Sequence, residues 1–126
     1  MSTFQHVLVV LDPSQEAQKA LARAVELAKL TQCRFTAFLS IYDFSYEMTT
    51  MLSGEERESM RQAVIRDREL WIEQLVQPFR QQGFQIEMKV VWHNRPFEAI
   101  VKAVADFGYD LVIKGTHQHD VLKSLI

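Results

Sequence analysis

The chain has 126 residues, which is enough for one domain with a buried core. Hydrophobic residues make up 48% and charged residues 24% of it, a composition typical of folded globular proteins and unlike that of disordered segments. The formal net charge of −2, with no block of like charges, excludes an electrostatic surface for nucleic acid, and the short apolar runs exclude a membrane span of roughly 20 residues.

The cysteine count and the N-terminal residues give two further limits on the class of protein. The single cysteine, Cys33, excludes an internal disulfide framework and a multi-cysteine metal site. Residues 1–6 carry no basic segment ahead of an apolar stretch, so no signal peptide is predicted. We therefore expect a cytoplasmic location.

The first part of the chain predicts a strand, a helix and a second strand. Residues 7–11 form an unbroken aliphatic run that ends at Asp12, as in a strand buried on both faces. From Ser14 onward apolar residues recur at three- and four-residue steps, which predicts an amphipathic helix to about Leu30 with Ser14 as its N-cap. Aromatic and β-branched residues at 35–42 predict the second strand.

The middle of the chain predicts a loop and a long helix. Residues 43–53 have no clear period and indicate the loop. Ser53 and Glu56 have the spacing of a capping box, in which each side chain satisfies an unpaired N–H of the first helical turn. Pro78 predicts a kink or an early end in the last turns of the helix, and Gly83 is suited to its termination.

The last part predicts a third strand, a third helix and a fourth strand. Residues 86–92 alternate between apolar and polar side chains, which favours a strand at a sheet edge. The next helix is expected to start with Asn94 as its cap and Pro96 in its first turn, and to end at Gly108. Residues 109–114 predict the fourth strand. The buried face of the third helix is expected to comprise Ile100, Val101, Val104 and Phe107.

Strands that alternate with helices in this way predict an α/β fold, an open parallel sheet with right-handed crossovers and helices on both faces. The third strand at one edge and the first and fourth strands in the middle give the strand order 3-2-1-4. Ligands bind such sheets at the carboxyl ends of the strands, where the strand order reverses. Asp12 follows the first strand and Gly115 follows the fourth, so both are expected at one crevice at this reversal.

Several segments resemble the universal stress protein family. Residues 9–14 (VVLDPS) are similar to the opening strand of the family, which ends in an aspartate before a helix. Residues 96–100 (PFEAI) and 109–116 (YDLVIKGT) resemble the later signature, a helix begun by proline and a strand that leads into a glycine. The resemblance covers essentially the whole chain. The sequence of residues 114–120 (KGTHQHD) is similar to that of the first module in a bacterial subtype with two modules in tandem.

The resemblance also implies a ligand site, and the residues at that site imply weak binding of phosphate groups. In members that bind ATP, the aspartate and the end of the second strand hold the nucleoside, and two glycines in a G-x-x-G pattern bring backbone N–H groups to the phosphates. The glycine pattern is broken here by Gln118, and the later G-[ST] pair would fall beyond the last residue. The resemblance therefore implies that ATP, or another small anionic ligand, binds weakly at most. The candidate ligand-binding residues are Asp12, Ile41, Gly115, Thr116, His117 and Gln118.

Each of these residues also has a purely structural interpretation. Asp12 equally fits a turn residue or a helix cap, and Gly115 equally fits a glycine that only turns the chain. His117 and His119 lack a further ligand of fixed geometry, so no metal site is predicted. The chain contains no P-loop, no G-x-S-x-G and no G-x-G-x-x-G, so it is expected to be no enzyme, with weak nucleotide hydrolysis left open.

Two functions from different classes remain open at this point. The first is a cytoplasmic stress-response module, regulatory or ligand-binding, with a nucleotide-type crevice whose phosphate motif is degraded. The second is a structural assembly domain that dimerises and whose pocket is vestigial. Material that co-purifies in the crevice would favour the first, and an empty crevice with tight self-association would favour the second.

The end of the sequence predicts an incomplete module. The apolar run at 111–113 is typical of a strand covered on both faces, and only residues 116–126 follow it, too few for another helix and a fifth strand. We expect residues 1–126 to be the first of two universal stress protein modules in a longer chain. The missing neighbour of the fourth strand is then supplied by further chain, by pairing with a second domain, or by a second copy in a homodimer.

Overall fold

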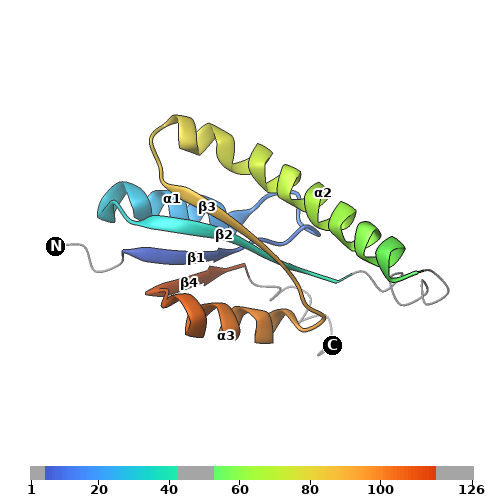
Figure 1. The fold of residues 1–126 in the computed structure, drawn as a ribbon. Helices are drawn as coiled ribbons and strands as arrows, with labels where there is room; N and C mark the ends of the chain where they lie inside the picture. Colours follow the sequence, from blue (N-terminus) through green and yellow to red (C-terminus); the bar gives the residue numbers. More distant parts are fainter. Residues whose placement is uncertain (1–4, 43–52, 116–126) are drawn as a thin grey trace, which may run out of the picture.

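A computed structural model describes residues 5–42 and 53–115. Its elements alternate between strands and helices, as the sequence predicts (Figure 1). They are β1 His6–Val10, α1 Lys19–Thr31, β2 Arg34–Ile41, α2 Gly54–Gln81, β3 Ile86–Trp92, α3 Pro96–Phe107 and β4 Leu111–Lys114. The expected loop at 43–53 lies outside the described residues apart from Ser53.

The four strands form one parallel sheet in the order β3-β2-β1-β4. This confirms the α/β class and the strand order 3-2-1-4, with β3 at one edge. In β1 the register places Val7 beside Phe35 of β2 and beside Leu111 of β4. Because β1 has a strand on each side and helices over each face, its unbroken aliphatic run is the sequence that a central parallel strand requires.

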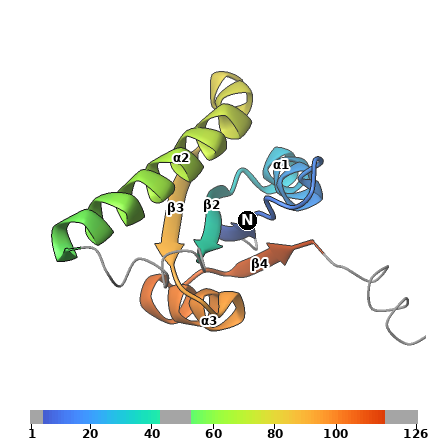
Figure 2. The same ribbon diagram turned by 90° about the vertical axis from the view of Figure 1, so that its right-hand side faces the viewer.

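The helices lie on both faces of the sheet (Figures 1 and 2). Right-handed crossovers place α1 and α2 on one face, because β1, β2 and β3 follow each other in the same direction across the sheet. The chain then crosses back to β4, which puts α3 on the opposite face. The crossover thus reverses between β1 and β4, as the site prediction requires.

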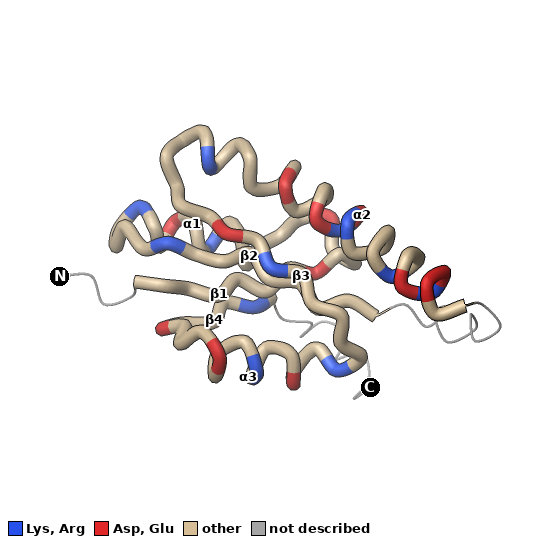
Figure 3. Tube along the Cα trace, in the orientation of Figure 1, with Lys and Arg blue, Asp and Glu red and all other residues tan. Residues whose placement is uncertain are grey.

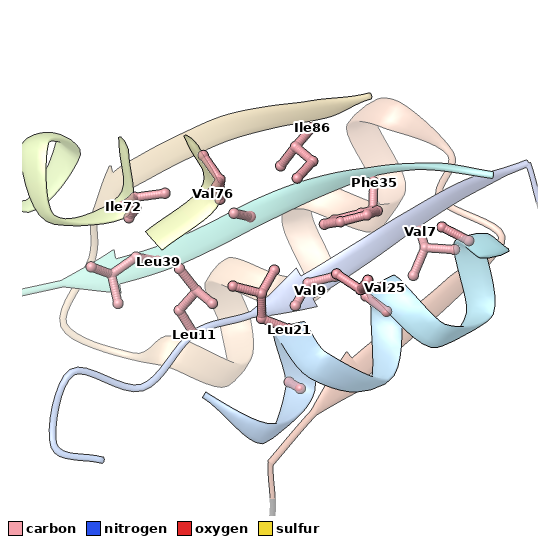
Figure 4. Packing of buried hydrophobic residues seen from close by; sticks show 14 of the residues in the cluster. Val7, Val9, Leu11, Leu21, Val25, Phe35, Leu39, Ile72, Val76 and Ile86 are labelled. Carbon is pink, nitrogen blue, oxygen red and sulfur yellow. The ribbon is translucent and has the colours of Figure 1, made fainter. Parts of the chain in front are cut away.

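The alternation of side chains along β1 divides the core into two clusters. Val7 and Val9 belong to the larger cluster, beneath α1 and α2, in which Leu21 and Val25 face the sheet (Figure 4). Leu8 belongs to the smaller cluster, beneath α3. Residues of opposite parity in one strand therefore stabilise opposite layers of the domain.

The start of α1 differs from the prediction. The helix begins at Lys19, and its N-cap position is Gln18, whose side chain makes no capping hydrogen bond. The expected cap, Ser14, lies in a turn in which its backbone N–H and its hydroxyl both donate to Asp12 Oδ1, at 2.9 and 2.6 Å. This turn uses the hydrogen-bonding groups that would have started a helix at Ser14, so the helix begins later.

The capping of α2 agrees with the prediction in its main contact. Ser53 Oγ accepts a hydrogen bond from the backbone N–H of Glu56, at 3.2 Å. The Glu56 carboxylate accepts from the Ser53 hydroxyl, at 2.9 Å, and so completes the box through the side chain. The predicted stop after the helix is also confirmed, since Gly83 follows the C-cap with a φ of 100°.

The early end expected at Pro78 is wrong, because α2 continues to Gln81. The last turn is held by Arg80, whose Nε and Nη2 donate to the Ile86 carbonyl oxygen of β3 at 3.0 and 2.8 Å. Arg80 Nη1 also forms an ion pair with Glu73, two turns earlier on the same face of the helix, at 2.8 Å. These contacts fix the helix end against the sheet and offset the hydrogen bond that proline removes.

The N-terminus of α3 has Pro96 in its first turn, as predicted, but Asn94 is not the cap. The N-cap position is Arg95, and its backbone N–H donates to Nδ1 of His93 at 2.9 Å. The helix ends at Gly108 with a φ of 66°, a left-handed conformation that favours glycine.

The buried face of α3 agrees with the prediction only in part. Ala99, Ile100 and Ala103 are buried, whereas Val101 and Phe107 are 54% and 52% exposed. Small alanine side chains let the helix approach the sheet over the bulky Phe38 of β2, which is fully buried in the same cluster. The prediction is therefore confirmed for Ile100 and for Val104, which packs against the same cluster, and wrong for Val101 and Phe107.

Asp110 joins the amino ends of β1 and β4. Its Oδ2 accepts from the backbone N–H groups of His6 and Gln5, at 2.9 and 3.0 Å. These two donors, His6 first, hold the pKa of the Asp110 carboxyl below its usual range. A lowered pKa in the folded state contributes stability above the ordinary value of about 3.9, and this stability is lost as the pH falls through the folded-state pKa.

Asp110→Asn is therefore expected to lower the urea midpoint of unfolding at pH 6, with a difference from the parent that shrinks as the pH falls toward 3. At low pH the parent carboxyl is protonated and resembles the neutral amide. Circular dichroism during urea titration measures both midpoints. Asp67→Asn, on the exposed surface of α2, serves as the control and should leave the midpoint nearly unchanged. A difference that stays constant from pH 6 to pH 3 would contradict the role of the charge.

The longest helix, α2, has 28 residues and carries charges of both signs along its length (Figure 3). Among the described residues, no helix combines the length and the apolar character that crossing a membrane requires.

Candidate functional site

An open cavity of about 550 Å³ lies where β1 and β4 end and α1 begins. Asp12 and Gly115, which are far apart in the sequence, both line it. The structure thus brings together two of the predicted residues at the reversal of the strand order. This volume is in the usual range for small-molecule pockets, about 300–1,000 Å³.

The other predicted residues are not part of this cavity wall. Ile41 is buried at the end of β2, where its carbonyl oxygen accepts from the His93 N–H, and it does not line the cavity. The predictions for Thr116, His117 and Gln118 lie outside the described residues. Their roles as ligand contacts stay predictions.

Asp12 is held by its own loop. Its Oδ1 accepts both hydrogen bonds from Ser14, and its carbonyl oxygen accepts from the Gln15 N–H at 3.1 Å. The structural interpretation of Asp12 as a turn residue is therefore correct. A fixed carboxylate at a cavity wall is also what a ligand contact requires, because its position needs no reorganisation on binding.

Gln18 is a residue that the sequence reasoning missed. Its Nε2 donates to the carbonyl oxygens of Asp12 and Gln15, at 2.7 and 2.8 Å, and its Oε1 accepts from the Asp12 N–H at 2.9 Å. One side chain thus closes the loop between β1 and α1 and sets the wall of the cavity. The only signal in the sequence is a glutamine directly before the helix, which is too common to be informative.

Three cationic side chains at the cavity were also missed. Lys19 and Arg23 come from α1 and Lys114 comes from the end of β4. The spacing of four residues between Lys19 and Arg23 places them on one helix face, which the sequence alone indicates. That this face borders the cavity follows only from the packing of α1 on the sheet. The apolar part of the wall is formed by Val10, Ala20, Leu27 and Ile113.

Gly115 is not required by local packing or backbone conformation. A Cβ at this position would meet no atom within 4 Å among the described residues, and its φ is outside the left-handed region that favours glycine. The space next to its Cα is therefore open among the described residues. Such space is what a ligand that approaches the chain closely would use.

Metal chemistry has no visible support in the part of the chain that the structure describes. There, no group of three or more His, Cys, Asp or Glu side chains is placed to hold a metal ion. The His117 and His119 pair lies outside that part.

Comparison with known proteins shows which proteins this chain is similar to. The family model described as "Universal stress protein family" matches residues 3–126. Universal stress protein E of Escherichia coli K12 is 53% identical over 126 residues, which is all of this chain and 40% of that protein. A universal stress protein E homolog of Haemophilus influenzae is 40% identical over 127 aligned positions, covering 98% of this chain and 41% of the homolog. The chain thus spans about 40% of the length of these relatives.

Solved structures share the fold at low sequence identity. The universal stress protein UspA from Lactobacillus plantarum aligns with a TM-score of 0.62 and 19% identity, over 93% of this chain and 82% of that one. A universal stress protein solved in complex with cAMP aligns with a TM-score of 0.53 and 18% identity, over 96% and 83% of the two chains. At this identity the likeness supports the fold alone.

Proposed function

The chain belongs to the universal stress protein family, and we propose that it is a cytoplasmic stress-response module that binds a small ligand in the crevice between β1 and β4. In this proposal the module regulates through its ligand and is not an enzyme. The observation that carries it is the convergence of Asp12 and Gly115 on one cavity at the reversal of the strand order.

The walls of the cavity support a ligand with a polar and an apolar part. Apolar side chains from β1, α1 and β4 line one region, while Asp12, Gln15 and Gln18 supply polar groups beside them. Pockets for small molecules usually combine an apolar wall with a few fixed polar groups. The relative solved with cAMP makes a nucleotide a reasonable class of ligand to test first.

ATP itself is expected to bind weakly or not at all. The glycine pattern that grips phosphates in ATP-binding members has Gln118 at its second position, where a side chain impedes close approach of the backbone.

The experiment that tests the function is mass spectrometry of small molecules released when the purified chain is denatured, followed by calorimetric titration with Mg-ATP. We expect a co-purifying organic ligand and no micromolar affinity for Mg-ATP. If no small molecule is released from the purified chain and none of a panel of nucleotides binds in the titration, the proposal is contradicted. Micromolar binding of Mg-ATP would contradict its weak-binding part, and a Gln118→Gly variant that gains no affinity would contradict the explanation given for it.

The second candidate function is an assembly domain. Among the described residues, β4 pairs only with β1, so one edge of the sheet carries no strand there. Phe97 of α3 is 73% exposed, and Val101 lies one turn further on the same helix. Open edges and exposed apolar side chains are typical of surfaces that pair with another chain.

In the assembly proposal the module is the first of two in a tandem protein and pairs with the second domain or with another copy. Its relatives are long enough for such an arrangement, since the chain covers only 40% of them. Light scattering distinguishes the two candidates when combined with the mass spectrometry. Tight self-association with an empty crevice favours assembly, and a ligand-loaded monomer favours binding.

A further inference from the structure

We propose that Lys19, Arg23 and Lys114 bind the anionic group of the crevice ligand, so that side-chain cations replace the backbone grip on phosphate. This inference rests on the function proposed above and narrows the ligand to an organic anion with a compact apolar part. It also places the anion at the carboxyl ends of β1 and β4, beside the start of α1.

The cavity places the three cations on two of its walls. Lys19 and Arg23 are one helical turn apart on α1, a rise of about 6 Å, and both line the cavity. Lys114 ends β4 and is paired in register with Val10 of β1, which also lines the cavity. Because Val10 packs against the cluster beneath α3, the register places Lys114 on that face of the sheet, so the cations border the cavity from two elements, α1 and β4.

The first turn of α1 departs from a rule that α2 and α3 follow. Both α2 and α3 carry acidic residues in their first turn, which suits the positive end of a helix, whereas α1 has no acidic residue there and starts with Lys19. Arg23 then places a second positive charge at the i+4 position, where like charges repel. Local rules are most often broken where function requires it.

The cations at the cavity take part in none of the ion pairs of the described residues. Some cations away from the cavity pair with acids three or four residues away, as in Arg61–Glu58, Arg95–Glu98 and Lys102–Asp106. Among the described residues, none of the ion pairs involves Lys19, Arg23 or Lys114. Their charge is thus available to a ligand.

The one acidic residue of the cavity does not cancel this charge. Asp12 is the only carboxylate among the described lining residues, and Ser14 donates two hydrogen bonds to its Oδ1. Three cations against one carboxylate leave the cavity positive. The apolar wall of Val10, Leu27 and Ile113 then limits the ligand to one whose anionic group is joined to an apolar body.

The test is an NMR titration of the ¹⁵N-labelled chain with inorganic pyrophosphate and, separately, with the neutral nucleoside adenosine. Pyrophosphate is expected to shift the backbone signals of residues 18–23 and 114–115. A Lys19→Gln/Arg23→Gln variant should bind pyrophosphate about tenfold more weakly, because two charge-assisted contacts are lost. Higher salt should weaken binding to the parent more than to the variant.

The matched control is Lys29→Gln/Arg66→Gln, which removes the same charge from exposed positions of α1 and α2 outside the cavity. It should keep the parent affinity for pyrophosphate. Thermal melting checks that both variants fold, and the Lys19/Arg23 variant should melt no lower than the parent because a repulsion is removed.

Each outcome decides a different point. Equal pyrophosphate affinity in the parent and the Lys19/Arg23 variant, or an equal loss in the control, overturns the cation assignment. Adenosine shifts at the cavity without any from pyrophosphate also overturn it, while the proposed function stands. If neither compound shifts the cavity signals, the cation assignment and the proposed ligand-binding function both fail.

Discussion

Replacing Phe35 with alanine is expected to lower the free energy of unfolding by about 3–5 kcal/mol. Phe35 is 0% exposed in β2, beside Val7 of β1 and Ile86 of β3 in the register of the sheet, within the larger core cluster (Figure 4). Truncation removes apolar contacts and leaves a cavity that the neighbouring strands cannot fill. Since small domains are stable by only about 5–15 kcal/mol, the variant should have lost a large part of its stability.

Urea unfolding, followed by the fluorescence of Trp71 and Trp92, measures this loss. Phe97→Ala provides the control with the same change of side chain, because Phe97 is 73% exposed on α3. Its free energy of unfolding should change by no more than about 0.5 kcal/mol. Similar losses in both variants would contradict the core assignment and would indicate that the face of α3 around Phe97 is covered.

The sheet could be predicted from the sequence because its signals are local and redundant. The aliphatic run of β1 and the alternation of β3 each determine a burial pattern, and the handedness of crossovers then leaves few strand orders. The start of α1 was not predictable in this way. It depends on whether Ser14 caps a helix or closes a turn with Asp12, and the hydrogen bonds of Gln18 decide in favour of the turn.

The exposure of Val101 and Phe107 on α3 was mispredicted for a related reason. Hydrophobicity ranks valine and phenylalanine above alanine, but a helix that lies over Phe38 needs small residues at the contact. The bulk of a side chain on another element therefore determined which face of α3 is buried. A sequence read one element at a time does not contain that information.

Only the part of the candidate site that the strand order positions could be predicted from the sequence. Asp12 and Gly115 follow strands, so a correct strand order places them at one cavity. Lys19 and Arg23 belong to a helix whose rotation about its axis sets what they face, and this follows from the packing of Leu21 and Val25 on the sheet. The cationic wall therefore became visible only in three dimensions.

Gln18→Ala is expected to lower the free energy of unfolding by about 2 kcal/mol and to reduce the amount of ligand retained in the crevice. The side chain makes three hydrogen bonds to the backbone of Asp12 and Gln15, each worth about 0.5–1.5 kcal/mol net. Without them the loop between β1 and α1 loses its fixed conformation, so the Asp12 carboxylate has to be ordered again when a ligand binds. Urea unfolding measures the first effect, and mass spectrometry of the released ligand measures the second.

Two further variants separate the contributions of this side chain. Gln18→Glu keeps an acceptor for the Asp12 N–H but turns the donating group into a carboxylate oxygen that faces the carbonyl oxygens of Asp12 and Gln15, so its stability should be no higher than that of Gln18→Ala. Gln15→Ala is the control, because Gln15 contributes its carbonyl oxygen to this network and alanine retains that group. It should unfold at nearly the parent midpoint. If Gln15→Ala and Gln18→Ala were equally destabilised, the loop would depend on side-chain bulk, and the hydrogen-bond explanation of the cavity wall would be wrong.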